Sequence, residues 1–268
     1  MRFLLHLAFS TILFLSIDNL NAQQNNPAEE YFQMAETSRR NMHLDSAIFY
    51  YNQAATEFQN LGNTERFIDS YNQIGVVLTR QDKYEEAKTY LNKALSEGHI
   101  LPDSNSLSIA TTYISLGVVF NAEGKYEQSL TCHNKCLSIR LLKLGENDAQ
   151  VATSYGNLGN MYRNNKEFDK SIEAHLKAME IRNKLFGETS IEIIESYVGL
   201  GNAYREKGEY PMSVEYFEKA LRNKIIQRGD GHKDLGRYYK YLSDVYYIMG
   251  DKDEGDLYKS KYEAVSGN

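Results

Sequence analysis

Tryptophan is absent from the 268 residues, and proline occurs only three times. Because proline interrupts helices and is frequent in the turns of β-rich proteins, its scarcity favours a helical chain. A surplus of basic residues is also missing: 30 lysines and arginines face 36 acidic residues, which gives a net charge of −6. This balance argues against a general nucleic-acid binder, and we expect no nucleic-acid partner.

The sequence also lacks the motifs of common enzyme classes. It has no glycine-rich phosphate loop, no nucleophile elbow and no metal-ligand spacing. The histidines that follow His6 have no acid or nucleophile recognisable beside them. We therefore expect no enzyme, no catalytic residue, no metal and no cofactor.

The N-terminus, MRFLLHLAFSTILFLSIDNLNAQQ, differs from the rest of the chain. Arg2 precedes an apolar run from residue 3 to residue 17, and the small residue Ala22 follows. This order predicts a signal peptide over residues 1–22 with cleavage near Ala22. The alternative is an uncleaved membrane anchor, for which the run is short of the roughly 20 residues needed. We expect a mature chain of residues 23–268 without a membrane span, exported to the periplasm or the extracellular space.

The rest of the sequence repeats itself. The stretches SYNQIGVVL, TYISLGVVF, SYGNLGNMY, SYVGLGNAY and YYKYLSDVY begin 42 residues apart, at Ser70, Thr112, Ser154, Ser196 and Tyr238. A weaker first copy, EYFQMAETS, begins at Glu30. The chain therefore divides into six predicted repeats: 28–67, 68–109, 110–151, 152–193, 194–235 and 236–268.

Each repeat has two helical halves. In the first half, residues such as Tyr155, Leu158, Gly159 and Tyr162 follow the spacing i, i+3, i+4, i+7, which places them on one helix face. A glycine inside a helix costs about 1 kcal/mol relative to alanine. Its return therefore predicts that a second helix approaches closely; these glycines are Gly75, Gly117, Gly159 and Gly201.

The second half alternates small and large residues at packing positions. The small ones are Ala87, Ala94, Ser129, Cys136, Ser171, Ala178, Ser213 and Ala220. The large ones between them are Leu91, His133, His175 and Phe217. Together the two halves resemble the tetratricopeptide repeat over nearly all of residues 28–264, and the 42-residue length is similar to the subclass found in kinesin light chains.

This resemblance implies an all-α fold, a right-handed superhelical solenoid of about six antiparallel helix pairs with the first helices on the concave side. The ends depart from the pattern: Ser243 replaces the repeated glycine, while Gly255 and Lys259 stand at packing positions. Terminal repeats of a solenoid are expected to be atypical because one side faces water.

The segment TCHNKC, residues 131–136, raises the question of a metal or redox site. Cys136 occupies a small-residue position and His133 a large-residue position, so both are predicted to pack in the core. A disulfide from Cys132 to Cys136 within one helix would strain the bond. A metal site or redox pair, with His175 of the next repeat as a further member, stays the alternative.

Candidate partner-binding residues lie on the first helices, beside the packing face. Asparagine can pair with the backbone of an extended peptide and arginine with a carboxylate. The predicted groove residues are Arg80, Asn121, Asn157, Asn160, Arg163, Asn164, Asn202 and Arg205. The resemblance implies peptide binding there, but the lysine of a full carboxylate clamp is replaced by Gly156 and Val198. The alternative is a solvated face with hydrogen bonds between helices.

The last repeat is rich in tyrosine, at residues 238, 239, 241, 246 and 247. We expect several of these rings to be exposed, because one helix has one core face, and they form a second candidate docking surface. The alternative is a helix that packs through aromatic rings.

These observations predict a non-catalytic protein–protein interaction scaffold that binds a peptide or protein partner in a concave groove. The alternative is a sensory or regulatory accessory of a bacterial two-component or envelope signalling system, acting through a separate partner. The sequence indicates neither the partner nor the oligomeric state.

Overall fold

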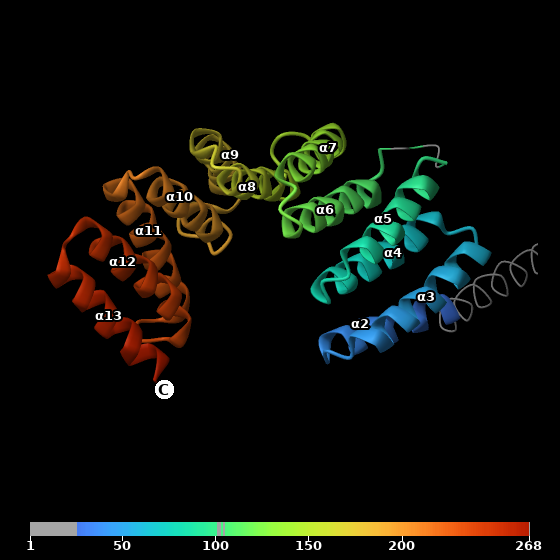
Figure 1. Ribbon diagram of the computed structural model, residues 1–268, viewed down its shortest axis with the longest axis horizontal. Helices are drawn as coiled ribbons and strands as arrows, with labels where there is room; N and C mark the ends of the chain where they lie inside the picture. Colours follow the sequence, from blue (N-terminus) through green and yellow to red (C-terminus); the bar gives the residue numbers. More distant parts are fainter. Residues whose placement is uncertain (1–25, 101–102, 104, 268) are drawn as a thin grey trace, which may run out of the picture. The chain divides into compact units, whose positions relative to one another are not determined.

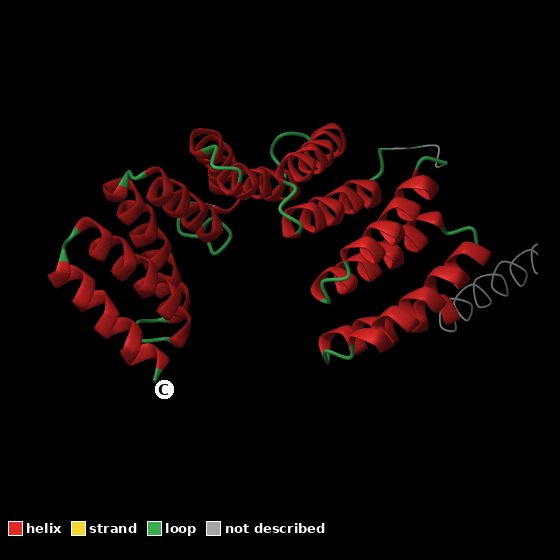
Figure 2. Ribbon diagram, viewed as in Figure 1, coloured by secondary structure: helices red, strands yellow, loops and turns green. Residues whose placement is uncertain are grey.

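The computed structural model describes residues 26–100, 103 and 105–267 (Figure 1). All regular elements in these residues are helical and none is a strand (Figure 2). The α-helices are α2 (Pro27–Arg40), α3 (Leu44–Asn60), α4 (Thr64–Arg80), α5 (Tyr84–Gly98), α6 (Leu107–Ala122), α7 (Tyr126–Leu144), α8 (Ala149–Asn164), α9 (Phe168–Phe186), α10 (Ile194–Lys207), α11 (Tyr210–Arg228), α12 (Gly236–Met249) and α13 (Lys252–Ser266), and a short 3-10 helix, η1 (Lys233–Leu235), precedes α12.

The helices form consecutive packed pairs. The contacting pairs include α2 with α3, α4 with α5, α8 with α9, α10 with α11 and α12 with α13. The first helices α4, α6 and α8 begin a few residues before the boundaries predicted for their repeats. The chain forms two compact units, one ending at Ser115 and the other beginning at Leu116, so the division lies within α6.

The turn inside each pair contains a left-handed residue. Glycine, which has no Cβ, adopts this conformation at Gly124, Gly208 and Gly250, whereas Lys166 adopts it with φ 62° at the equivalent position between α8 and α9. The backbone N–H of the following residue then bonds back to the first helix, as Glu167 does to the carbonyl of Tyr162 at 2.8 Å. The left-handed residue thereby ends one helix and starts the next within three residues.

The repeated glycines allow the two helices of a pair to touch, as predicted. A Cβ placed on Gly201 would lie 2.5 Å from the ring of Phe217, and one on Gly75 would lie 2.6 Å from Leu91. Gly117 and Gly159 receive the rings of His133 and His175 in the same way. The predicted small residues of the second helices are all buried, so both halves of the packing pattern are confirmed.

A serine-to-glycine hydrogen bond joins the two helices of a pair at this contact, and in the last pair its donor and acceptor are on the opposite helices. Ser213 on α11 donates its hydroxyl to the carbonyl of Gly201 on α10, at 2.7 Å. In the last pair the serine and the glycine exchange places: Ser243 on α12 donates to the carbonyl of Gly255 on α13, at 2.9 Å. Lys259, which replaces Phe217, is exposed. The departures in the last repeat thus keep the helix contact while making its outer side polar.

The expectation of several exposed tyrosines in the last repeat is wrong. Tyr238 and Tyr239 are buried, and among the five only Tyr247 is exposed, at 39%. The reason is that α12 contacts helices on two sides, α11 and α13. Tyr241 stacks on Phe217 of α11 with ring centroids 4.9 Å apart, while Tyr246 stacks on a ring of α13.

The predicted signal peptide, residues 1–22, lies outside the residues that the structure describes. Within the described residues, none of the helices combines the length and the apolar character that crossing a membrane requires.

Candidate partner-binding site

A cavity of about 280 Å³ opens between the first helices α8 and α10, with the second helix α9 behind them. We call it the α8–α10 cavity. It is lined by Thr153, Gly156, Asn157 and Asn160 of α8, by His175 and Arg182 of α9, and by Glu195, Val198, Gly199 and Asn202 of α10. Three of the predicted groove residues therefore meet in one place.

These three residues are the asparagines of the α8–α10 cavity. The side-chain amides of Asn157, Asn160 and Asn202 make no hydrogen bond to any part of the chain that the structure describes. Asn160 and Asn202 are repeat-equivalent, and they face the cavity from consecutive first helices. Because each amide offers both a donor and an acceptor, the cavity presents three unused pairs of hydrogen-bonding groups.

Arg182 supplies the positive charge of the α8–α10 cavity. Its Nη1 donates to the hydroxyl of Ser196 at 2.6 Å, which ties α9 to α10. The repeat-equivalent Arg140 uses its Nη1 for two acceptors, the hydroxyl of Ser154 and the carbonyl of Gln150. Arg182 has one such acceptor within the described residues. Burial lowers the pKa of Arg182, and the carboxylate of Glu195 partly offsets this. The guanidinium stays charged and retains donors for a further acceptor.

Gly156 leaves space above Arg182. A Cβ placed on Gly156 would approach no heavy atom more closely than 3.9 Å, and those atoms are the Nη1 and Nη2 of Arg182. Gly156 therefore differs from Gly159, where a Cβ would lie 2.6 Å from His175. Packing requires the glycine at position 159, whereas the glycine at position 156 keeps the cavity open in front of the guanidinium.

His175 forms the inner wall of the cavity. The ring lies between Gly159 and Gly199, is 2% exposed, and neither ring nitrogen has a hydrogen-bond partner. Burial above all, with the charges of Arg163 and Arg182 adding to it, lowers the pKa of His175 to about 4. The imidazole is therefore neutral at pH 7 and serves as a packing ring beside two helix backbones.

The other predicted groove residues lie elsewhere. Arg163 pairs with Glu206 at 2.6 Å, and the amide of Asn164 donates to Asn121 at 2.9 Å, so these residues link neighbouring first helices. Arg205 is half-buried and forms no ion pair with any residue that the structure describes. Arg80 is exposed at the end of α4, in the unit that ends at Ser115.

Sequence reasoning missed the contribution of the second helix. The sequence predicts His175 as a packing residue or as a member of a metal or redox site, and Arg182 is not among the predicted groove residues, because the groove is expected from the first helices. The available signal was the second glycine of α8: Gly156 does not stand at the repeated packing position, so it had to serve another purpose.

Cys136 and His133 of the segment TCHNKC pack in the core of their repeat, as predicted. Cys136 is 1% exposed and its Sγ lies 3.6 Å from the hydroxyl of Ser154, while Cys132 is also buried. Burial raises the pKa of both thiols and, as with His175, lowers the pKa of His133 to about 4. No group of three His, Cys, Asp or Glu side chains suited to a metal ion occurs in the described residues.

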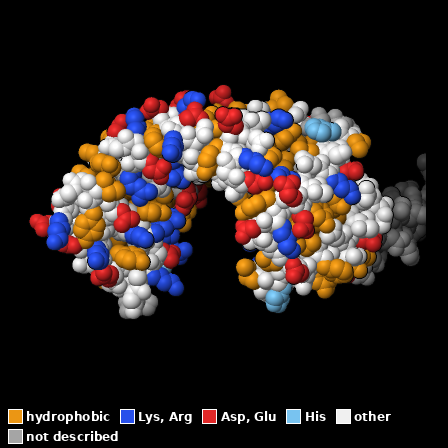
Figure 3. Space-filling view, in the orientation of Figure 1, with side chains coloured by type: hydrophobic (Ala, Val, Ile, Leu, Met, Phe, Trp, Pro, Cys, Tyr) orange, Lys and Arg blue, Asp and Glu red, His pale blue; other side chains and the backbone are white. Residues whose placement is uncertain are grey.

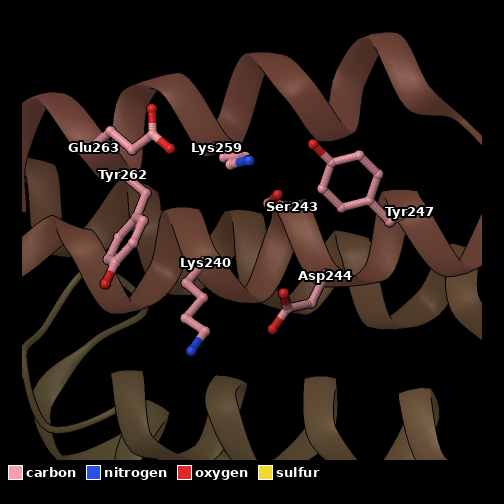
Figure 4. A pocket seen from close by; sticks show the side chains of 7 residues that line it. All are labelled: Lys240, Ser243, Asp244, Tyr247, Lys259, Tyr262 and Glu263. Carbon is pink, nitrogen blue, oxygen red and sulfur yellow. The ribbon is translucent and has the colours of Figure 1, made fainter.

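The last helix pair carries a separate cavity of about 260 Å³ (Figure 4). It is lined by Lys240, Ser243, Asp244 and Tyr247 of α12 and by Lys259, Tyr262 and Glu263 of α13. Lys240 and Asp244 point to the same side of α12 in Figure 4. Two lysines and two acids alternate there, in keeping with the mixture of acidic and basic side chains on the face in Figure 3. Such a mixed charged lining is typical of a surface that faces water.

Among curated proteins none matches the sequence. The structure is similar to BtubC (BKLC) from P. vanneervenii, with TM-score 0.75 and 18% identity over 84% of this chain and 91% of that chain. It is similar to a putative kinesin light chain with nearly identical TPR-like repeats from Podosopora anserina, with TM-score 0.67 and 16% identity over 75% and 95% of the two chains. A Rap protein complexed with competence and sporulation factor has TM-score 0.59 and 17% identity over 90% and 64%.

The sequence itself matches one family model. The model for the tetratricopeptide repeat matches residues 66–142, 108–182 and 150–226, which overlap and together extend over more than half of the chain. The kinesin light chain-like neighbours agree with the resemblance drawn from the 42-residue spacing. This chain belongs to the tetratricopeptide repeat family.

Proposed function

We propose that this protein is a non-catalytic scaffold that holds an extended segment of a partner protein in the α8–α10 cavity. The observation that carries the proposal is the convergence of three unused amides, Asn157, Asn160 and Asn202, on one cavity. An extended segment exposes backbone N–H and C=O groups along its length, and asparagine side chains match both.

The charge in the cavity indicates which kind of side chain the bound segment carries. Arg182 faces the open space above Gly156 and has one hydrogen-bond acceptor of its own. A carboxylate side chain entering there would form a charge-assisted hydrogen bond with the guanidinium. Arg182 is the one cationic side chain among the lining residues, and the carboxylate of Glu195, which also lines the cavity, is paired with Arg237 at 2.6 Å. We therefore propose a segment with one acidic residue between uncharged neighbours.

The fold comparison supports the general part of this proposal. A structural neighbour, the Rap protein, is complexed with competence and sporulation factor, so an array of this fold can carry a bound partner. At 17% identity that likeness concerns the fold alone. The choice of the α8–α10 cavity rests on this chain's own residues.

The test compares two variants that change asparagines on first helices of the repeats, α8 and α10 in one and α6 and α8 in the other. The cavity variant carries Asn157→Ala, Asn160→Ala and Asn202→Ala, and the control variant carries Asn121→Ala and Asn164→Ala, which removes the hydrogen bond between α6 and α8. Each is used to capture partners from an envelope extract of the source organism after its helicity and melting have been measured. We expect the wild type and the control to retain the same partner and the cavity variant to lose it. Retention of that partner by an equally folded cavity variant would refute the assignment of the site.

We also propose that the protein acts outside the cytoplasm, on the strength of the predicted signal peptide over residues 1–22. The mass of the protein purified from its own cells reports this directly. A chain that begins near Gln23 supports export, and a full-length chain in the cytosolic fraction contradicts it. The nature of the captured partner separates the scaffold from the signalling alternative, since a sensory accessory would retain a kinase or regulator.

A further inference from the structure

A third cavity, of about 360 Å³, lies among α7, α8 and α9 and is separate from the α8–α10 cavity. Its walls include the rings of Tyr155 and Tyr162 of α8, with Ala174 of α9 between them. We call it the tyrosine-lined pocket. Its volume falls within the roughly 300–1,000 Å³ typical of small-molecule sites, and its residues all belong to the unit that begins at Leu116.

The neighbouring repeats show what this space accommodates. The position of Ala174 is taken by Tyr216 in the next repeat and by Tyr258 in the last. Tyr216 stacks on Tyr204 with ring centroids 5.6 Å apart and planes 5° from parallel. Tyr258 stacks on Tyr246 at the same 5.6 Å and 8°. In both repeats a tyrosine of the second helix lies flat against a tyrosine of the first.

The repeat formed by α8 and α9 has the tyrosines of the first helix but has alanine in place of the tyrosine of the second helix. Tyr162 is equivalent to Tyr204, and Tyr155 is equivalent to Tyr197, whose ring centroid lies 6.2 Å from that of Tyr216. Alanine at position 174 fills little of the space between them, and the pocket is the volume left open. A tyrosine side chain supplied from outside would restore the arrangement of the two following repeats.

The pocket also offers a hydrogen-bond partner for the hydroxyl group of such a ring. In the last repeat the hydroxyl of Tyr258 donates to the carboxylate of Glu218 at 3.5 Å. The residue equivalent to Glu218 beside the pocket is Asn134 of α7, and it lines the pocket. The Asn134 amide forms no hydrogen bond within the described residues. A phenol in the pocket would therefore place its hydroxyl beside an unused amide.

The charges at the rim are already paired. Lys177 contacts Glu173 at 3.0 Å and lies over the Tyr155 ring at 5.6 Å. Lys170 pairs with Glu167 and lies over the Tyr162 ring. The pocket therefore favours a neutral ring over a charged group, and the two lysines stand where they cover an inserted ring, as Lys219 covers Tyr216 at 5.0 Å.

We propose that the tyrosine-lined pocket binds a tyrosine side chain presented by a partner protein. The inference is independent of the α8–α10 cavity, since it uses a different space and a different chemistry. It rests on three features that lie together: the rings of Tyr155 and Tyr162, the vacant ring position at Ala174 and the unused amide of Asn134.

The experiment uses p-cresol, which is the tyrosine side chain in isolation, and follows its binding to the intact protein by saturation-transfer NMR. Three variants accompany the wild type. Ala174→Tyr fills the pocket from within, Ser138→Tyr adds the same residue at an exposed position of α7, and Asn134→Ala removes the partner of the hydroxyl. If Ala174→Tyr fails to fold, Tyr162→Leu removes the stacking face instead.

We expect p-cresol to bind the wild type and the Ser138→Tyr control with a dissociation constant in the millimolar range, and to lose its signal with Ala174→Tyr. We also expect Ala174→Tyr to raise the melting temperature, and Asn134→Ala to weaken binding several-fold. Absence of binding to the wild type, or an equal signal from Ala174→Tyr, would overturn the site. Unchanged binding by Asn134→Ala would overturn the choice of tyrosine over phenylalanine.

Discussion

The two buried histidines should make the stability of this protein fall steeply as the pH drops from 7 to 5. His133 and His175 are 3% and 2% exposed, and burial lowers the pKa of each to about 4. In the unfolded chain the pKa of histidine returns to about 6.5. Below that pH the unfolded chain binds protons that the folded chain excludes, so stability is full above pH 6.5 and is lost as the pH falls towards 4.

The size of the effect follows from the two pKa values. Between pH 7 and pH 5, a histidine with a pKa of about 6.5 unfolded and about 4 folded lowers the free energy of unfolding by about 2 kcal/mol. Two such residues lower it by about 4 kcal/mol, which is a large part of the usual 5–15 kcal/mol. Leu91 occupies the same packing position on Gly75, so leucine is the natural replacement.

The assay is urea unfolding, followed by far-ultraviolet circular dichroism, at pH 7 and at pH 5. His133→Leu and His175→Leu should each recover about 2 kcal/mol of the loss, and the double variant about twice that. Carboxylates also titrate in this range, but they contribute equally to all variants. An exposed histidine, His99, provides the control through His99→Gln, which should leave the pH dependence unchanged. If the double variant keeps the pH dependence of the wild type, the two histidines are not its cause.

Two further predictions concern the glycines and the turns. Gly201→Ala places a Cβ 2.5 Å from the ring of Phe217 and should destabilise the fold by about 1–3 kcal/mol in urea unfolding. The Cβ of Gly156→Ala meets nothing closer than 3.9 Å, so this variant should stabilise the fold by up to about 1 kcal/mol. Equal effects of Gly201→Ala and Gly156→Ala on stability would contradict the assignment of Gly201 to packing and of Gly156 to the cavity. Lys166 has a φ of 62° in the turn where three other repeats have glycine. Lys166→Gly should therefore raise the melting temperature, with a stabilisation of roughly 1 kcal/mol. A lower melting temperature of this variant would show that the backbone at Lys166 is not strained.

The repeat spacing predicted paired helices with a close contact, and the resemblance to the tetratricopeptide repeat implied how the pairs follow one another. Gly159 and His175 stand at positions that recur every 42 residues, and the recurrence indicates a contact without any knowledge of coordinates. The last repeat was harder, because Ser243 and Gly255 exchange their roles and the pattern appears only when both changes are considered together. The predicted exposure of the tyrosines was wrong because α12 packs against both α11 and α13, and the sequence of one helix does not show how many helices surround it.

The candidate site was predictable only in part. Asn157, Asn160 and Asn202 could be placed on a common face from their spacing, since helical periodicity fixes which residues share a side. The pairing of Arg163 with Glu206 could not, because the two residues are at neighbouring rather than equivalent positions of their repeats. The entry of Arg182 into the cavity depends on the space left by Gly156, and this requires the distance between α8 and α9.

If a partner segment lies in the α8–α10 cavity, site-specific photo-crosslinking in living cells will attach it there. A photo-reactive amino acid replaces Asn160 in one version of the protein and Asn183, an exposed residue of α9, in another. We expect one discrete crosslinked partner from position 160, none from position 183, and loss of the product when Arg182→Ala is added. The same product from position 183, or none from position 160 in a folded protein, would contradict it.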